Sequence, residues 1–261
     1  TGGSTVSAGT LALNNATAGG SGAISLANGD TGASNVQLTL GASLANNITV
    51  SSSGSGTVNI YGNVQYGGQS GSITLNRAAI LQIPDTGSGA DWWYSFGGGG
   101  ISGTGGLTVR GGAGGTTAAT AGNRVVLGVA NTYSGGTVIE SGKLQFGAAG
   151  AAGTNTITLG NANTGSAVTQ LRLGVDVANN VVISSAAGAG SVPGIGLYTA
   201  VQTLSGALQI NHDVELDGGS DRLTWSGAGA VWSGSGNITI NGGRVTHDGA
   251  AILDFGGLPQ R

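Results

Sequence analysis

The first half of this sequence returns in its second half. Residues 5–11 (TVSAGTL) return at 137–144 (TVIESGKL), residues 44–50 (LANNITV) at 177–183 (VANNVVI), and residues 102–109 (SGTGGLTV) at 233–240 (SGSGNITI), displaced by 131 to 133 positions. Self-similarity of this kind is typical of stacked repeat architectures, in which each unit contacts only its neighbours. The sequence therefore predicts two similar super-repeats, residues 1–133 and 134–261, of one continuous structure that resembles a tile of a longer array.

Composition narrows the class of fold. The chain has 55 Gly in 261 residues and only 7% charged residues, without the Gly-X-Y period of collagen. A disordered Gly/Ser-rich linker is excluded by short apolar stretches that alternate with polar residues, which is the pattern of half-buried strands. No window has convincing helical periodicity, so the chain is predicted to be all-β. Examples of the alternating stretches are residues 36–40, 57–61, 72–75, 170–173 and 237–240.

The strand signals continue without a break, which favours a solenoid over a sandwich or barrel. Coils of roughly 20–25 residues predict on the order of a dozen coils. At about 4.8 Å per coil the rod would be roughly 50–60 Å long. Only one or two side chains per strand can point into such a coil, which suits 39% hydrophobic but only 5% aromatic residues. The predicted fold is a single elongated parallel β-helix.

Residues 125–147 carry a more specific signal. Their core is Asn131, Thr132, Tyr133, Ser134, Gly135 and Gly136, followed by a strand, a Gly and a Leu-containing strand. This stretch resembles the autotransporter passenger-associated β-strand repeat, and the segments from Leu44 and Ile101 resemble its spacers. The resemblance implies a right-handed parallel β-helix in a large bacterial cell-surface or secreted protein. Residues 251–257 (AILDFGG) depart from the core motif, and the resemblance implies no ligand or activity.

Two asparagine pairs precede a strand in each copy, Asn46 with Asn47 and Asn179 with Asn180. An Asn at such a corner can adopt the left-handed conformation and stack on its neighbour in the next coil. We therefore expect these four residues, like the 131–136 motif, to have a structural role rather than a binding role.

The expected location is extracellular, on the bacterial cell surface. The family resemblance points there, and the absence of Cys and Met suits an oxidation-resistant exposed protein. No stretch of 18 apolar residues is present, so no membrane contact is expected from this segment. Isolated Arg and Lys residues and a net charge of −3 make a nucleic-acid partner unexpected. No cofactor is expected, and no metal site, because the tandem nonapeptides of calcium-binding β-rolls are missing.

One charge-dense stretch, residues 212–217 (HDVELD), raises the question of catalysis, with Arg222, Arg244 and His247 about one coil later. Polysaccharide lyases and hydrolases with β-helix folds build sites from carboxylates and Arg on adjacent coils. The alternation places Val214 and Leu216 inward and the acidic residues outward, which is the pattern of a solvated strand face. The chain is therefore expected not to be an enzyme, and catalysis stays the weakest alternative.

The main aromatic cluster is Trp92, Trp93 and Tyr94 with Phe96. Exposed aromatic rings can stack on sugars, but adjacent residues of a strand face opposite sides, so one Trp is expected in the core. The three residues are candidates for contact with a cell-surface glycan or a host partner. Residues 84–91 are expected to form a loop that leaves the coil.

Three functional classes remain open. The leading hypothesis is a structural extracellular rod, the second an adhesin or carbohydrate-binding module, and the third a polysaccharide lyase or hydrolase. Neither terminus has an amphipathic segment that would cap exposed strand edges, as the loop-like residues 1–4 and 256–261 indicate. We therefore expect either continuing chain on both sides or end-to-end stacking of subunits, so that the expected partner is a second copy of the chain.

Overall fold

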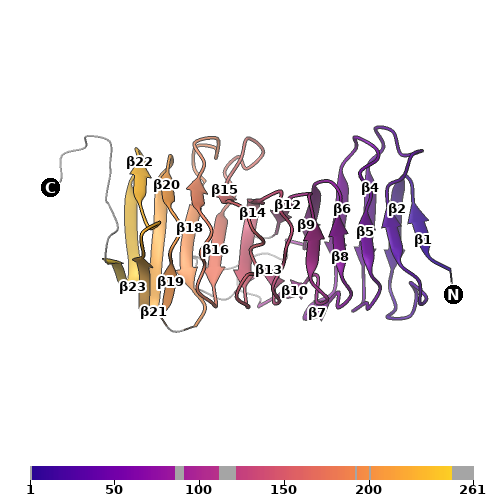
Figure 1. Cartoon of the computed structure of the whole chain (residues 1–261), viewed down its shortest axis with the longest axis horizontal. Helices are drawn as coiled ribbons and strands as arrows, with labels where there is room; N and C mark the ends of the chain where they lie inside the picture. Colours follow the sequence, from indigo (N-terminus) through magenta and orange to yellow (C-terminus); the bar gives the residue numbers. More distant parts are fainter. Residues whose placement is uncertain (1, 86–90, 112–121, 192, 200, 249–261) are drawn as a thin grey trace.

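The chain forms one elongated stack of parallel strands in the computed structural model, with β1 at one end and β23 at the other (Figure 1). The structure describes residues 2–85, 91–111, 122–191, 193–199 and 201–248. Within these residues it has no helix, and all the strand pairs are parallel. The predicted all-β solenoid is therefore confirmed.

Each coil has three faces. The first face consists of β1 (Ser4–Val6), β3 (Ile24–Leu26), β5 (Ile48–Val50), β8 (Ile73–Leu75) and β11 (Ile101–Gly103). The second face consists of β2 (Gly9–Leu13), β4 (Val36–Leu40), β6 (Val58–Gly62), β9 (Ala79–Gln82), β12 (Leu107–Arg110), the first part of β14 (Thr137–Phe146), β15 (Ile157–Leu159), β17 (Val181–Ile183), β20 (Leu208–Ile210) and β22 (Trp232–Gly234).

The third face consists of β7 (Gly67–Gly68), β10 (Trp93–Ser95), β13 (Arg124–Leu127), the last part of β14, β16 (Thr169–Leu173), β18 (Pro193–Leu197) and the first parts of β21 (Val214–Ser226) and β23 (Ile238–Asp248). Past β11 the first face continues through the backbone hydrogen bonds from Thr132 to Ile101 and from Ser134 to Gly103. Its last three strands are β19 (Gln202–Leu204), the last part of β21 and the last part of β23, which pair in that order.

The second face gives the number of coils. Its ten strands are related by nine coil steps, and a step ranges from 20 residues (Thr137 to Ile157) to 30 residues (Leu107 to Thr137). The prediction of about a dozen coils was therefore too high, because several corners carry longer loops than a 20–25-residue coil allows. Nine steps correspond to roughly 43 Å of rod.

The core is a column of apolar side chains that runs through the described coils. Along the second face the inward position is held by Leu38, Ile60, Leu81, Val109 and Ile139, each fully buried and each directly above the last. Alternate residues of the same strands point outward and are half-buried. The alternation predicted from sequence is confirmed at β4, β6 and β8, whereas every residue of β16 is buried and Ile238–Ile240 of β23 do not alternate.

The interior also holds large aromatic side chains, which the low aromatic content did not predict. Tyr94 is fully buried and packs on Phe96, with 4.8 Å between ring centroids. Gly62 and Gly67 leave the space for its ring, since a Cβ at Gly62 would lie 2.4 Å from Tyr94 Cγ. A large inward ring is thus accommodated where the neighbouring coil has no side chain.

The two copies of the sequence repeat do not occupy the same faces. Residues 5–11 span β1 and β2, on the first and second faces, whereas residues 137–144 span the two parts of β14, on the second and third faces. The other two matched segments shift in the same way, from β5 to β17 and from β11–β12 to β22–β23. The displacement therefore equals five coils plus one face.

Candidate functional site

The motif at residues 131–136 is built into the stack rather than offered to a partner. The Asn131 side chain accepts a hydrogen bond from the Ile101 backbone (2.7 Å) and donates one to the Ala151 carbonyl (2.7 Å), so it joins the coils before and after its own. Tyr133 is fully buried, with its hydroxyl 2.6 Å from the Thr137 hydroxyl. These contacts support the expected structural role of the motif.

The two asparagine pairs make matching bonds. Asn46 donates to the carbonyls of Gly20 and Gly22, at separations of 26 and 24 residues, and Asn179 donates to those of Gly153 and Asn155 at the same separations. The second Asn of each pair accepts from the next coil, Asn47 from the Ser72 backbone and Asn180 from that of Ala207.

Each pair therefore ties together three coils. The expectation of left-handed corners was wrong: the non-glycine residues with positive φ in the described part are Ala27 and Tyr66. The Asn side chains satisfy backbone groups of neighbouring coils, which does not require a special φ.

The aromatic candidates lie on and beside β10 of the third face. Tyr94 is fully buried and Trp92 is only 7% exposed, so neither can stack on a glycan, and the expectation that one Trp lies in the core is confirmed. Trp93 is half-buried and meets the exposed ring of Tyr66, with 5.8 Å between centroids. Of the three residues Trp93 alone keeps a surface for contact.

The residues of the acidic stretch at 212–217 lie in different environments. Val214 and Leu216 are buried as expected, and Asp213 accepts two hydrogen bonds from Asn237 one coil later (2.8 and 2.9 Å). Asp217 is only 4% exposed, so the expectation of a fully solvated strand face was wrong there. Its carboxylate accepts from the Gly219 backbone (2.8 Å), and Arg222 lies in register with Arg244 on the next coil.

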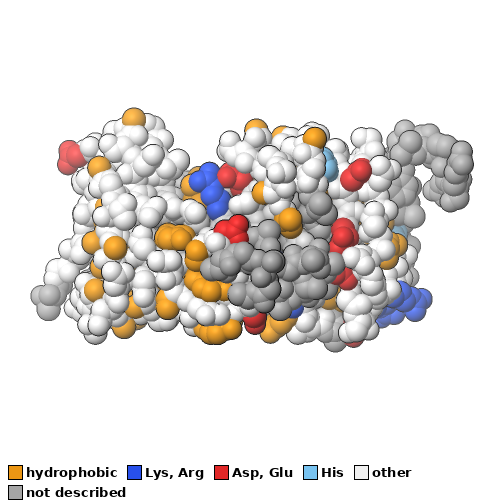
Figure 2. Space-filling model, turned by 180° about the vertical axis from the view of Figure 1, so that it is seen from behind, with side chains coloured by type: hydrophobic (Ala, Val, Ile, Leu, Met, Phe, Trp, Pro, Cys, Tyr) orange, Lys and Arg blue, Asp and Glu red, His pale blue; other side chains and the backbone are white. Residues whose placement is uncertain are grey.

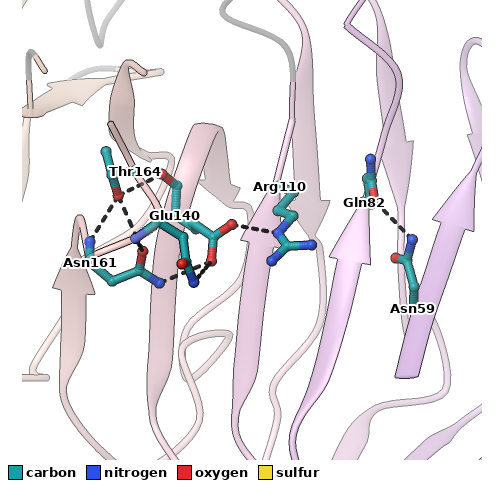
Figure 3. A network of polar contacts seen from close by, with 7 residues as sticks. Asn59, Gln82, Arg110, Glu140, Asn161 and Thr164 are labelled. Atoms are coloured by element: carbon teal, nitrogen blue, oxygen red, sulfur yellow. Dashed lines mark hydrogen bonds and ion pairs between the residues drawn. The ribbon is translucent and has the colours of Figure 1, made fainter. Parts of the chain in front are cut away.

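A polar row runs along the outside of the second face, and sequence inspection had not identified it. Gln37, Asn59 and Gln82 project from β4, β6 and β9, three successive coils. The Asn59 amide donates to Gln37 (3.2 Å) and to Gln82 (2.8 Å). The next strand, β12, contributes Arg110, which is in register with Gln82. The row has one side chain per coil along the rod axis, but it steps sideways by two residues between β6 and β9, because Gln82 is in register with Tyr61 and not with Asn59. Figure 3 shows Asn59, Gln82 and Arg110 on neighbouring strands of the stack.

Arg110 and Glu140 form the centre of this row. The Arg110 Nε donates to the Glu140 carboxylate at 2.5 Å. The other carboxylate oxygen accepts from Asn161 (3.0 Å) and Asn163 (3.4 Å), and the Glu140 carbonyl accepts from Thr164 (2.9 Å). Figure 3 shows Glu140 enclosed between Arg110 and the 161–164 loop.

The carboxylate owes its position to a β-bulge. Val109 pairs with Ile139, but Arg110 pairs with Ser141, so Glu140 is the extra residue of β14. The segment 137–144 is also one residue longer than the matched segment 5–11, and the difference falls between Val138 and Gly142, where Glu140 lies. Burial alone raises the pKa of Glu140, but the hydrogen bonds from Arg110 and Asn161 outweigh it and hold this pKa below its ordinary value.

Three adjoining hollows surround this ion pair, and all three include Arg110 in their lining. Their volumes are about 450, 410 and 230 Å³. Together they reach from Gly9 and Gln37 on the early coils, past Arg110, to Asn163 and Ser166 on the later ones. We call this surface the Arg110 groove: the hollows and the outward side chains of Gln37, Asn59, Tyr61, Gln82, Arg110 and Glu140.

A second polar cluster lies on the third face. Lys143 is only 1% exposed, although it points away from the core, and it is in register with Arg124 and Gln170. Burial, with the charges of Arg172 and Arg124, lowers the pKa of Lys143 to about 8, against an opposing effect of Asp217. Arg172 itself stacks on the Tyr198 ring at 4.5 Å. A buried amine of this kind affects the stability of the fold and is not accessible to a ligand.

Charged side chains are sparse and scattered on the side of the rod that Figure 2 shows. Among the described residues, no group of three or more His, Asp or Glu is arranged to hold a metal ion. In the same part of the chain, no helix is long and apolar enough to cross a membrane. No protein-family model, curated protein or solved structure matches this chain.

Proposed function

We propose that the chain is a rigid rod segment of a bacterial extracellular protein of the autotransporter type. Its role is structural: it spaces and displays other parts of the protein, and it extends by stacking end to end. The observation that carries the proposal is the apolar column, which the described coils share without a second core or a hinge between the two copies.

Hydrogen bonds between coils support the rigidity of the rod. The buried Asn131 and Asn46 side chains each bond the backbone of a neighbouring coil, in addition to the parallel strand ladders. Bonds of this kind hold each coil in register with the next, as in other repeat proteins whose stability comes from nearest-neighbour contacts. The resemblance of residues 125–147 to passenger repeats supports the extracellular, autotransporter-like origin.

The last described coil supports stacking. Ile240 holds the position that Leu216 holds one coil earlier, yet Ile240 is 59% exposed while Leu216 is fully buried. At the other end β1 and β2 pair on one side only within the described residues. Within the described residues, an exposed apolar position at the last coil and strands that pair on one side only are suited to a further coil, from continuing chain or from a second copy.

Electron microscopy and analytical ultracentrifugation test this role. We expect rods whose length rises in multiples of one subunit with concentration, and Ile240→Glu to shorten them. Val201→Glu is the matched control, because Val201 is 40% exposed away from the last coil. Dispersed monomers at all concentrations would contradict stacking, and flexible particles would contradict the rigid rod.

Antibody labelling tests the location. An antibody raised against the isolated chain is expected to bind intact cells of the source bacterium as strongly as permeabilised cells. Labelling that requires permeabilisation would contradict the extracellular assignment, whatever the shape of the particle.

A further inference from the structure

We infer that the Arg110 groove binds an extended, uncharged glycan that lies along the rod axis. This goes beyond a structural rod, because it gives one face of the molecule a ligand. The inference rests on the geometry of the second face, where polar side chains from successive coils line adjoining hollows.

The groove is polar but close to neutral. Its hollows are lined by two cationic residues, Arg77 and Arg110, and by two acidic residues, Asp85 and Glu140, so the formal charges cancel. Glu140 forms an ion pair with Arg110, and the other side chains of the row are neutral amides. A polyanion such as nucleic acid or a sulfated polymer needs several unpaired cations in line. This surface does not supply them, so the charge favours a neutral polymer.

Amide side chains match the chemistry of sugar hydroxyls. Each Gln or Asn offers both an acceptor oxygen and a donor NH₂, and each hydroxyl can likewise donate and accept. The Asn59 amide nitrogen donates to Gln37 and Gln82 in the absence of ligand, while the Asn59 side-chain oxygen is buried with no hydrogen-bond partner among the described residues. The row is therefore held in place before a ligand arrives, which lowers the entropic cost of binding.

An aromatic ring lies beside the hollows, and a largely buried apolar side chain lines two of them. Tyr61 projects outward from β6 in register with Gln82, and it is half-buried, so part of its ring faces solvent. Ile80, on the neighbouring strand, lines two of the three hollows. Sugar rings have apolar faces that pack on such surfaces while their hydroxyl edges bond to amides.

The spacing fixes the orientation of the ligand. Gln37 and Asn59 are in register on two coils, and Gln82 and Arg110 are in register on the next two, displaced by two residues along the strands. Polar groups therefore recur about every 4.8 Å along the axis, with one sideways step in the row. A polymer of similar unit length can repeat the same contacts from coil to coil. A compact ligand would use only one hollow, and a polymer lying across the rod would leave the row after one strand.

The test is binding of the full chain to a glycan array that carries neutral linear oligosaccharides (hexamers of glucose, mannose and N-acetylglucosamine) beside polygalacturonate and heparin. We expect at least one neutral hexamer to bind, and Gln82→Ala and Tyr61→Ala each to weaken that binding by about tenfold or more. Gln209→Ala is the matched control, because Gln209 is an outward, exposed glutamine on the same face but outside the groove.

Circular dichroism and thermal melting of each variant identify any loss that comes from unfolding. Oligosaccharides of increasing length then test the orientation, since affinity should rise with chain length up to the length of the groove. Three results would overturn the inference. The first is that no neutral glycan binds, whether or not the anionic polymers do. The second is unchanged binding in Gln82→Ala and Tyr61→Ala, and the third is binding that depends on Trp93 instead.

Discussion

The two copies of the super-repeat share their hydrogen-bonded corners but not the faces on which those corners lie. In the first copy the Asn46–Asn47 corner leads from the third face to the first, and in the second copy the Asn179–Asn180 corner leads from the first face to the second. The side chains still bond to carbonyls 26 and 24 residues earlier in both. The same hydrogen-bonded corner therefore occurs at two different edges of the coil.

The outward residues follow a different rule. Thr10, on the second face, corresponds to Lys143, on the third, and Glu140 has no counterpart in the first copy because it is the inserted residue of a bulge. What is common to the copies is the stacking, and what differs is the surface. Because the second copy is rotated by one face relative to the first, matched segments of the two copies also lie on different sides of the rod.

The largest effect is expected at the joint between the copies. Tyr133→Ala removes a fully buried ring just before the second copy begins, and we expect it to lower the free energy of unfolding by about 3–5 kcal/mol. Urea denaturation followed by circular dichroism measures the change. Tyr66→Ala, at a ring that is 55% exposed, is the control and should change it by less than about 0.5 kcal/mol. Equal losses of unfolding free energy in Tyr133→Ala and Tyr66→Ala would show that the buried ring does not stabilise the joint.

The Asn46 and Asn179 corners should contribute differently to the free energy of unfolding, although their hydrogen bonds match. Asn46 is buried and donates to a third carbonyl, that of Gly19 (3.1 Å), whereas Asn179 is half-buried. We expect Asn46→Ala to cost about 2–3 kcal/mol and Asn179→Ala about 1 kcal/mol, because unsatisfied carbonyls cost more when they are buried. The same denaturation experiment compares the two variants directly. Equal costs would mean that burial does not distinguish the corners.

Lys143, which corresponds to Thr10 of the first copy, should make the free energy of unfolding depend on pH. The pKa of Lys143 is about 8 in the folded chain, below its ordinary value, so the unfolded chain binds the proton more tightly between about pH 8 and 10.5. Stability should therefore rise with pH across this window, by about 1–2 kcal/mol, and Lys143→Met should remove the rise. Denaturation midpoints from pH 7.5 to 10 measure it.

The reciprocal variant sharpens this test. Thr10→Lys places an amine at the matching position of the first copy, where the side chain is exposed. An exposed amine has nearly the same pKa in the folded and unfolded chain, so this variant should add no slope of its own. A similar slope from both positions would rule out burial as the cause.

Much of the fold could be predicted from the sequence, because alternation and repetition are local signals. The stretches 36–40, 72–75 and 237–240 are strands as expected. The number of coils could not be predicted well, since corner loops of different length leave no local mark on the pattern. The burial of Tyr94 depends on Gly62 and Gly67, more than 25 residues earlier, and is equally invisible locally.

The Arg110 groove was missed for a related reason. Arg110 and Glu140 are 30 residues apart and meet only through the register of β12 and β14 with its bulge. Isolated charges in a Gly-rich chain look alike until the register is known. The signal that was present is the extra residue at Glu140 between otherwise matched segments, which marks a place where the second copy departs from the first.

The smallest effect on stability is expected at Glu140, the residue at which the second copy departs from the first. The pKa of Glu140 is held below its ordinary value in the folded chain, so its contribution to stability is present above about pH 4.5 and is lost as the pH falls further. Arg110 is 36% exposed, so we expect the contribution to be at most about 0.5–1 kcal/mol. Glu140→Gln keeps the shape of the side chain and should flatten the acid side of the stability curve without changing it at pH 7 by more than this amount. If the variant unfolds the chain instead, the bulge needs the charge for folding, and the two copies differ in their scaffold as well as in their surface.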